Sequence, residues 1–305
     1  MRKVTLFGTD LTVSQICLGT SGFGRRLDKE TAFDFLDRFA DAGGNFVDTA
    51  NLYSRDFEAL ISRSEEILGE YAKARPNTQL LIATKGGHYD RVTKEKRVNR
   101  ACVGADLEES LRTLGRETID LYWLHRDDPE IPVEEIVDMM EDFVKSGKIR
   151  YYGASNYTAE RLAKAKNYAK SIGAQGFSAV SNYWTLLKEN EGFPLSSDNT
   201  LVAWRKRDLV GAAELGLPLV PFSSTGKGWL AKGVEHAGER LNLSFDNPEN
   251  REFREEMIKK AVAEGCPLQT AFLRAMSEYG EALGLQIIPI TACSNSSQLE
   301  ELLEF

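Results

Sequence analysis

The sequence is poor in the residues that build metal centres and disulfide frameworks. It contains three histidines and four cysteines in 305 residues. Because histidines are so few, a His-rich metal site is not expected. The cysteines lie far apart and form no C-x-x-C pair, which predicts buried thiols in a reducing cytoplasm rather than disulfides or a zinc site. They are Cys17, Cys102, Cys266 and Cys293.

Long hydrophobic runs and an excess of positive charge are missing as well. No run approaches the roughly 20 residues of a membrane span, and the start, MRKVTLFGTD, lacks the apolar stretch and cleavage site of a signal peptide. The net charge of −8 argues against a nucleic-acid partner, because phosphate binding needs clustered lysine and arginine. These absences favour a cytoplasmic protein that acts on a small molecule. Nothing in the sequence indicates an oligomeric state.

What the sequence does have is an alternation of short apolar runs with helical patterns. Eight strand–helix units follow one another with no linker between them. This order predicts an α/β fold, a closed (β/α)8 TIM barrel, as a single domain over residues 1–305. The opening segment VTLFGTDLTVSQI (4–16) is typical of a β-hairpin, which would plug the barrel floor. An open doubly wound sheet is the alternative, but GTSGFG matches its phosphate-binding turn, G-x-G-x-x-G, poorly.

The last units of the barrel are less regular. The pattern predicts a helix within 199–216, a seventh strand over 218–224, and then a long loop before the helical segment 267–280. An eighth strand, QIIPITACS, and the start of a final helix, SQLEELLEF, close the chain.

Ionisable residues stand at the carboxyl ends of the predicted strands. Asp48, Lys85 and His125 end three consecutive strands, and Tyr53 follows Asp48 by five residues. In a barrel these ends line one mouth, where the active site is built. The exit of a strand from the core explains one polar residue, but it explains Asp, Lys and His at three successive ends poorly. We therefore expect these four residues to form a site for proton transfer.

The same segments resemble the aldo-keto reductase family. The resemblance covers nearly the whole chain and rests on GGNFVDTANLYS, IATKGG, IDLYWLHRDDP, GKIRYYGASNYT and the closing SQLEEL. It implies NAD(P)H-dependent, metal-free reduction of aldehydes and ketones. Tyr53 would donate the proton, with its pKa lowered by Lys85. Asp48 would hold Lys85, and a neutral His125 would orient the carbonyl oxygen. A plain strand-end salt bridge between Lys85 and Asp48 is the structural alternative.

The resemblance also implies a site for NADP(H) or NAD(H). Ser181 stands where the family usually has glutamine, and Trp184 is expected to stack on the nicotinamide. Lys227, in a glycine-rich loop, is expected to meet the pyrophosphate. Near the adenosine end Ser294 replaces the usual arginine or lysine and glutamates follow it, so only a weak preference for NADPH is expected. The implied cofactor-binding residues are Thr20, Ser155, Asn156, Ser181, Trp184, Phe222, Ser223, Lys227, Ser294, Gln298 and Glu301.

The substrate pocket is the least specified feature. The residues assigned to it are Phe23, His88, Arg126 and Trp229. They combine charge, hydrogen bonding and a flat apolar wall, which suits a sugar, a keto-sugar or another polyhydroxylated or anionic carbonyl compound. The arginine can equally form a structural ion pair with the neighbouring Asp127 or Asp128. The segment SRDFEALISR (54–63) is expected to form part of the pocket wall.

Two other functions stay open at this point. One is a Schiff-base aldolase on the same barrel, which would use Lys85 as its nucleophile. The other is a nicotinamide-binding subunit that senses redox state without turnover.

Overall fold

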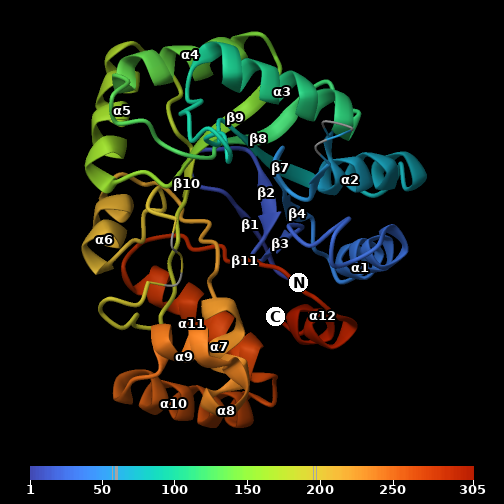
Figure 1. Cartoon of the computed structure of the whole chain (residues 1–305), viewed down its shortest axis with the longest axis vertical. Coiled ribbons are helices and arrows are strands. Elements are labelled where there is room, and N and C mark those ends of the chain that lie inside the picture. The colour runs from blue at the N-terminus through green and yellow to red at the C-terminus, as the bar shows by residue number, and fades with distance from the viewer. Residues whose placement is uncertain (57, 59–60, 195, 197) are drawn as a thin grey trace.

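The chain folds into a barrel of parallel strands surrounded by helices (Figure 1), as seen in a computed structural model that describes residues 1–56, 58, 61–194, 196 and 198–305. Seven strands form one sheet in the order β10-β9-β8-β7-β4-β3-β11, with neighbours parallel. Their bounds are β3 (Cys17–Gly19), β4 (Phe46–Asp48), β7 (Leu81–Gly86), β8 (Ile119–Leu124), β9 (Ile149–Ser155), β10 (Ala179–Ser181) and β11 (Ile290–Thr291).

An eighth segment, residues 217–222, closes the barrel between β10 and β11. The Val220 amide donates to the Val180 carbonyl (2.8 Å), and the Ile290 amide donates to the Pro221 carbonyl (2.9 Å). The two prolines of this segment have no backbone N–H to donate, so it forms isolated bridges instead of a regular strand. The predicted (β/α)8 barrel is confirmed, with an irregular seventh strand.

The predicted N-terminal hairpin is also confirmed. Strands β1 (Lys3–Thr5) and β2 (Thr12–Ser14) pair antiparallel. Leu6, Leu11 and Val13 are buried in the same apolar cluster as the inward-facing side chains of the barrel, so the hairpin plugs the barrel floor. The barrel members of this cluster are Cys17, Phe46, Ala83, Leu121, Trp123, Ala179, Val220, Ile288 and Ile290.

Amphipathic helices form the outer layer (Figure 1). In α1, Asp28 caps the N-terminus by accepting from the Thr31 amide (2.9 Å), and Phe35 and Phe39 recur at helical spacing on the buried face. Helix α3 ends at Leu114 and is capped by Gly115, whose φ of 63° suits a residue without a Cβ. These helices are α1 (Lys29–Asp41), α2 (Arg63–Ala74), α3 (Arg100–Leu114), α4 (Val133–Lys145), α5 (Ala159–Ser171), α6 (Lys206–Glu214), α11 (Leu268–Ala282) and α12 (Ser296–Leu303).

Helix α6 begins at Lys206, later than the segment 199–216 suggested. The preceding residues are held in a non-helical path by hydrogen bonds to Asn156 and Tyr157, which follow β9. The Val202 amide donates to Asn156 Oδ1 (3.2 Å), and Trp204 Nε1 donates to the Tyr157 carbonyl (2.9 Å). Tertiary contacts therefore override the local helical pattern here.

The prediction of a long loop after the seventh strand is wrong, because this segment forms a further set of helices. Helix α10 was missed because its apolar residues are sparse: only Asn250, Met257 and Ala261 of its 17 residues are buried. The elements are η1 (Gly226–Gly228), α7 (Trp229–Lys232), α8 (Val234–Ala237), α9 (Glu239–Phe245) and α10 (Pro248–Glu264).

A two-stranded ribbon lies between β4 and α2. Its strands are β5 (Arg55–Asp56) and β6 (Ile61–Ser62), paired antiparallel. Part of the predicted pocket-wall segment 54–63 lies outside the described residues. Within the described part of the chain, none of the helices combines the length and the hydropathy that a bilayer crossing needs.

Candidate active site

The barrel brings the four predicted proton-transfer residues to one mouth. Asp48 ends β4, Lys85 lies at the end of β7, and His125 directly follows β8. These strands are neighbours in the sheet, so their carboxyl ends converge. Tyr53 comes from the loop after β4. The ring of Tyr53 lies 6.1 Å from that of His125, centroid to centroid.

Lys85 is the centre of the group. Its ammonium donates to the Asp48 carboxylate, to the Thr49 carbonyl (2.8 Å) and to the Tyr53 hydroxyl (3.2 Å). Both Lys85 and Asp48 are only 2% exposed. Burial alone would lower the pKa of Lys85, but the charge of Asp48 and the bond to Tyr53 outweigh it, and the pKa lies above its ordinary value. Lys85 is therefore a fixed positive charge at the Tyr53 oxygen.

The pKa of Tyr53 lies above its ordinary value. Burial raises it most, and Asp48 raises it further, while the adjacent Lys85 lowers it. Lys85 lowers the pKa of Tyr53, as expected. The net pKa is nevertheless raised rather than lowered, because the cost of burying the phenolate is the larger effect. The phenol stays protonated at neutral pH, as a proton donor must.

His125 is a buried, neutral imidazole. Burial lowers its pKa well below the usual range, and the cationic Arg126 lowers it further. Its Nδ1 is buried without a hydrogen-bond partner. Asn156 Nδ2 (3.0 Å) and Arg126 Nη1 (2.7 Å) both donate to the His125 carbonyl and fix its backbone. The ring can therefore offer a hydrogen bond without carrying charge.

His88 stands beside His125 with its ring edge-on at 4.8 Å. Burial and the charge of Arg126 lower the pKa of His88 to about 4. Its Nδ1 bonds the Tyr89 carbonyl at 2.8 Å. A carbonyl only accepts, so Nδ1 carries the proton of the neutral ring and Nε2 is left as an acceptor. His88 thus offers the lone pair of Nε2 beside His125.

The next two strand ends bear the residues assigned to a cofactor carboxamide. Ser155 Oγ donates to the Ser181 carbonyl (2.7 Å), and the Ser181 hydroxyl is buried without a partner. Asn156 has a left-handed φ of 65°, and its backbone N–H donates a hydrogen bond to Asn182 Oδ1 (2.8 Å) that holds this conformation. The left-handed backbone of Asn156 is held in place by its hydrogen bonds, and the buried Ser181 hydroxyl lacks a partner. Both features are typical of a site that binds a polar group.

Three further cofactor assignments lie at or just after strand ends. Trp184 lies against Tyr279 of α11, with ring centroids 5.8 Å apart. The Phe222 amide donates to the Asn182 carbonyl (3.3 Å), and its half-buried ring packs against the apolar cluster inside the barrel. Thr20 is buried, and its hydroxyl donates to the Asp48 carbonyl (3.0 Å). In this structure Thr20 therefore binds the backbone at Asp48.

The loop after the seventh strand carries a positive cluster. Ser223 and Lys227 both have left-handed φ values, 52° and 53°. Partial burial lowers the pKa of Lys227, and the nearby Arg240 and Arg26 lower it further. Three neighbouring cations at one place are suited to a phosphate group. The sequence predicts Lys227 as a cation of this site but not Arg26, for which the arginine pair in GFGRRLD is the only signal.

At the expected adenosine end, the N-terminus of α12 is capped by its own side chains. The Ser294 amide donates to Gln298 Oε1 (2.7 Å), and the Gln298 amide donates to Asn295 Oδ1 (2.9 Å). Glu300 is paired with Arg38 of α1 at 3.1 Å. Burial and the charge of Glu304 raise the pKa of Glu301. The N-terminal region of α12 is thus lined by the neutral and acidic side chains that the sequence predicts there.

The substrate assignments separate into two kinds. His88 lies at the mouth, whereas Phe23 and Trp229 are enclosed in the apolar core, 1% and 0% exposed. Trp229 Nε1 donates to Asn242 (3.0 Å). Both assignments to a pocket wall are therefore wrong in this structure, because packing of the surrounding loops covers these rings.

Arg126 is engaged by the loop that crosses the mouth. Its Nη2 donates to Asp198 (2.9 Å) and its Nε to Thr200 (2.8 Å). The partner is thus neither of the neighbouring aspartates. Those two bind other cations instead: Asp127 pairs with Arg161 and Asp128 with Lys96.

Comparison with known proteins agrees with this arrangement. A family model described as the aldo/keto reductase family matches residues 15–305. A norsolorinic acid reductase of Emericella nidulans is 30% identical over 95% of this chain and 73% of its own length. An aryl-alcohol dehydrogenase (NADP(+)) of Phanerodontia chrysosporium is 29% identical over 75% of this chain and 66% of its own length. A putative aryl-alcohol dehydrogenase of Saccharomyces cerevisiae is 30% identical over 93% and 74%, respectively.

Proposed function

The chain belongs to the aldo/keto reductase family, and we propose that it reduces an aldehyde or ketone to an alcohol with a nicotinamide cofactor and with Tyr53 as the proton donor. The observation that carries this proposal is the contact of Lys85 with both Asp48 and the Tyr53 hydroxyl at the barrel mouth. The bound nicotinamide supplies the hydride for the carbonyl carbon.

The residues of the chain handle the proton. Tyr53, protonated at neutral pH, donates to the carbonyl oxygen as negative charge develops there. Lys85 stabilises the phenolate that is left, and Asp48 holds the ammonium in place. His125, as a neutral donor, orients the same oxygen. Ser155, Asn156 and Ser181 are proposed to hold the carboxamide, and Lys227 with Arg26 and Arg240 the pyrophosphate.

The Schiff-base alternative is weaker. A lysine nucleophile must lose its proton, but the buried pair with Asp48 keeps the pKa of Lys85 above its ordinary value. Such a lysine stays an ammonium at neutral pH and does not attack a carbonyl.

We propose that the substrate carries a hydroxyl beyond its carbonyl. The Nε2 lone pair of His88, next to His125, accepts a hydrogen bond from such a group. Hydroxylated aryl carbonyls and sugars both satisfy this requirement, and the aryl class is favoured by the names of the relatives.

A pair of aldehydes tests this substrate class. We expect a higher kcat/KM for 3-hydroxybenzaldehyde than for 3-methoxybenzaldehyde, by about 2- to 12-fold, since one hydrogen bond contributes about 0.5–1.5 kcal/mol. His88→Phe should remove the difference while the methoxy compound reacts at its original rate. A preference that survives in the variant would show that His88 does not read the hydroxyl. Glyceraldehyde in the same assay compares the sugar class.

Cofactor preference is expected to be weak. The cations near Lys227 would meet a pyrophosphate, which both cofactors carry, whereas Ser294 offers one neutral hydroxyl to a 2′-phosphate. We expect NADPH to bind at most about tenfold tighter than NADH, a difference of ~1.4 kcal/mol. Ser294→Arg should tighten NADPH selectively, by about 1.5–3 kcal/mol. Titration of both cofactors at one ionic strength measures this, and a wild-type preference of about a hundredfold would place the phosphate site elsewhere.

A further inference from the structure

We propose that Glu109 of helix α3 is a positioning residue for Tyr53. It grips the loop that carries the tyrosine and sets the distance between the phenol and Lys85. This inference rests on the proposed role of Tyr53, but the grip itself is a separate structural feature.

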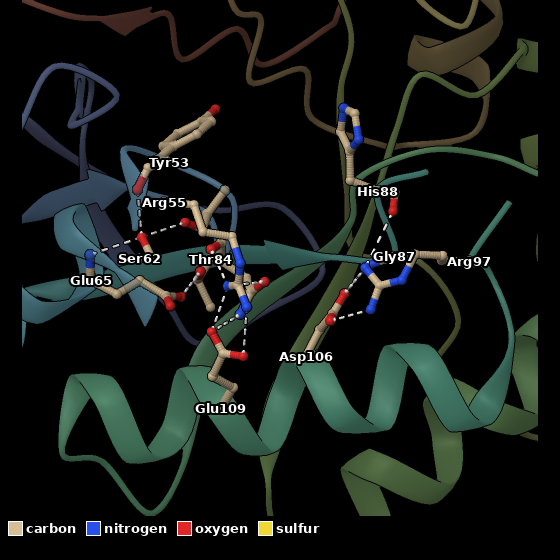
Figure 2. Close-up of polar contacts among 12 residues, drawn as sticks. Tyr53, Arg55, Ser62, Glu65, Thr84, Gly87, His88, Arg97, Asp106 and Glu109 are labelled. Atoms are coloured by element: carbon tan, nitrogen blue, oxygen red, sulfur yellow. Dashed lines mark hydrogen bonds and ion pairs between the residues drawn. The ribbon is translucent and has the colours of Figure 1, made fainter. Parts of the chain in front are cut away.

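The grip is a three-residue cluster of Glu109, Arg55 and Asn51. Figure 2 shows Arg55 above Glu109 of α3. Arg55 binds the carboxylate with both terminal nitrogens, Nη1 to Oε1 at 2.6 Å and Nη2 to Oε2 at 3.1 Å. Asn51 Nδ2 donates to the same Oε1 at 2.9 Å. Arg55 Nη1 also donates to the Asn51 carbonyl at 3.2 Å. One carboxylate therefore holds two points of the loop.

These two points flank Tyr53, which lies between them in the chain. On the barrel side the Asn51 amide donates to the Lys85 carbonyl (3.0 Å). On the α2 side Ser62 Oγ donates to the Tyr53 carbonyl (2.8 Å). Removing the carboxylate leaves these two bonds in place but takes away the link from the Asn51 and Arg55 side chains to α3. The loop is then held only through its backbone on either side of the Tyr53 side chain, so we expect the tyrosine to tilt away from Lys85.

The ion pair is sheltered enough to constrain the loop. The side chains of Arg55 and Glu109 are 17% and 16% exposed. Bidentate, charge-assisted pairs with little exposure are stronger and more directional than ordinary surface pairs. A bidentate pair at the surface also exists in this chain: Arg75 binds Asp37 through Nε (3.0 Å) and Nη2 (2.9 Å), with 44% of the arginine side chain exposed. It offers a matched control.

One turn earlier in α3, Asp106 binds the loop after β7 in the same manner. Asp106 accepts from the Gly87 amide (2.9 Å) and pairs with Arg97 (2.7 Å). Arg97 also reaches the carbonyl of His88 (3.4 Å). Residues three apart lie on one helix face, and Figure 2 shows both carboxylates reaching up from α3 toward the loops that bear Tyr53 and His88. Helix α3 is thus a common support for the two loops.

The test compares Glu109→Gln with Arg75→Gln. Glu109→Gln keeps the shape but loses the charge and replaces one acceptor by a donor. We expect kcat for aldehyde reduction to fall about 10- to 100-fold, since a shift of about 1 Å at a reacting group can cost about 10²-fold. The Kd of NADPH should stay within about twofold. The alkaline limb of kcat should move to higher pH, because a displaced Tyr53 loses the pKa-lowering effect of Lys85. Arg75→Gln should change none of these quantities.

Amide hydrogen exchange over residues 50–56 supplies a readout that needs no turnover. We expect faster exchange in Glu109→Gln than in wild type or Arg75→Gln. Unchanged exchange, or a kcat within about twofold of wild type, overturns the inference. A loss of NADPH affinity as large as the loss of kcat also overturns it, since that pattern means general damage. If wild type reduces no aldehyde but the exchange rises as expected, the proposed function fails and the grip stands.

Discussion

Tyr53→Phe is expected to lower kcat by about 10²- to 10⁴-fold, the usual contribution of a positioned general acid. The phenyl ring still packs beside His125, but it has no proton to give. The proposed cofactor-binding residues Ser155 and Asn156 are untouched, so the Kd of NADPH should change by less than about twofold. Single-turnover reduction and fluorescence titration of the cofactor measure the two quantities separately.

Tyr151→Phe provides the matched control. Its hydroxyl donates to Asp10 (3.0 Å) at the hairpin that plugs the opposite end of the barrel. The same atom is removed, yet kcat should stay near the wild-type value. A Tyr53→Phe variant that keeps more than about a tenth of wild-type activity would show that another group is the acid.

Lys85→Met is expected to lower kcat by a similar factor and to change its pH dependence. Because the proposed acid is the protonated phenol of Tyr53, the rate is expected to fall as pH rises through the pKa of Tyr53. Burial raises that pKa, and Lys85 opposes the rise. Without the ammonium the opposition is lost, the pKa rises further, and the alkaline limb should leave the measurable range. Initial rates between pH 6 and 11 test this, and an unchanged limb would remove Lys85 from the mechanism.

The substitution also leaves Asp48 buried without its cation, which costs about 3–5 kcal/mol of stability. The double variant Lys85→Met, Asp48→Asn removes both charges and should fold more stably than the single one. Its kcat should remain as low, because the ammonium is still missing. Recovery of activity in the double variant would mean that the loss came from unfolding.

The barrel and its four central residues could be predicted because their signals are local. Asp48, Lys85 and His125 each follow an apolar run, and parallel strands of a barrel bring such ends together whatever the details of packing. The plug was predictable from two short alternating runs around a turn. These features depend on period and order along the chain.

Features that depend on packing could not be predicted. Arg126 pairs with Asp198, 72 residues away, across a loop whose path no local pattern specifies. The pKa of Tyr53 is raised because its burial outweighs the charge of Lys85, and the extent of burial cannot be read from the order of residues. Trp229 was assigned to a pocket but lies in the core, because the helices after the seventh strand, read as a loop, enclose it.

The most direct test of carbonyl reduction is the stoichiometry of product formation by the purified chain. Wild-type protein is incubated with NADPH and 3-hydroxybenzaldehyde at pH 7, and the alcohol formed is quantified by chromatography against the NADPH consumed. We predict one alcohol for each NADPH oxidised, and none when the cofactor is left out. Tight binding of NADPH with no alcohol from this aldehyde, its methoxy analogue or glyceraldehyde would contradict the account and favour a redox-sensing subunit.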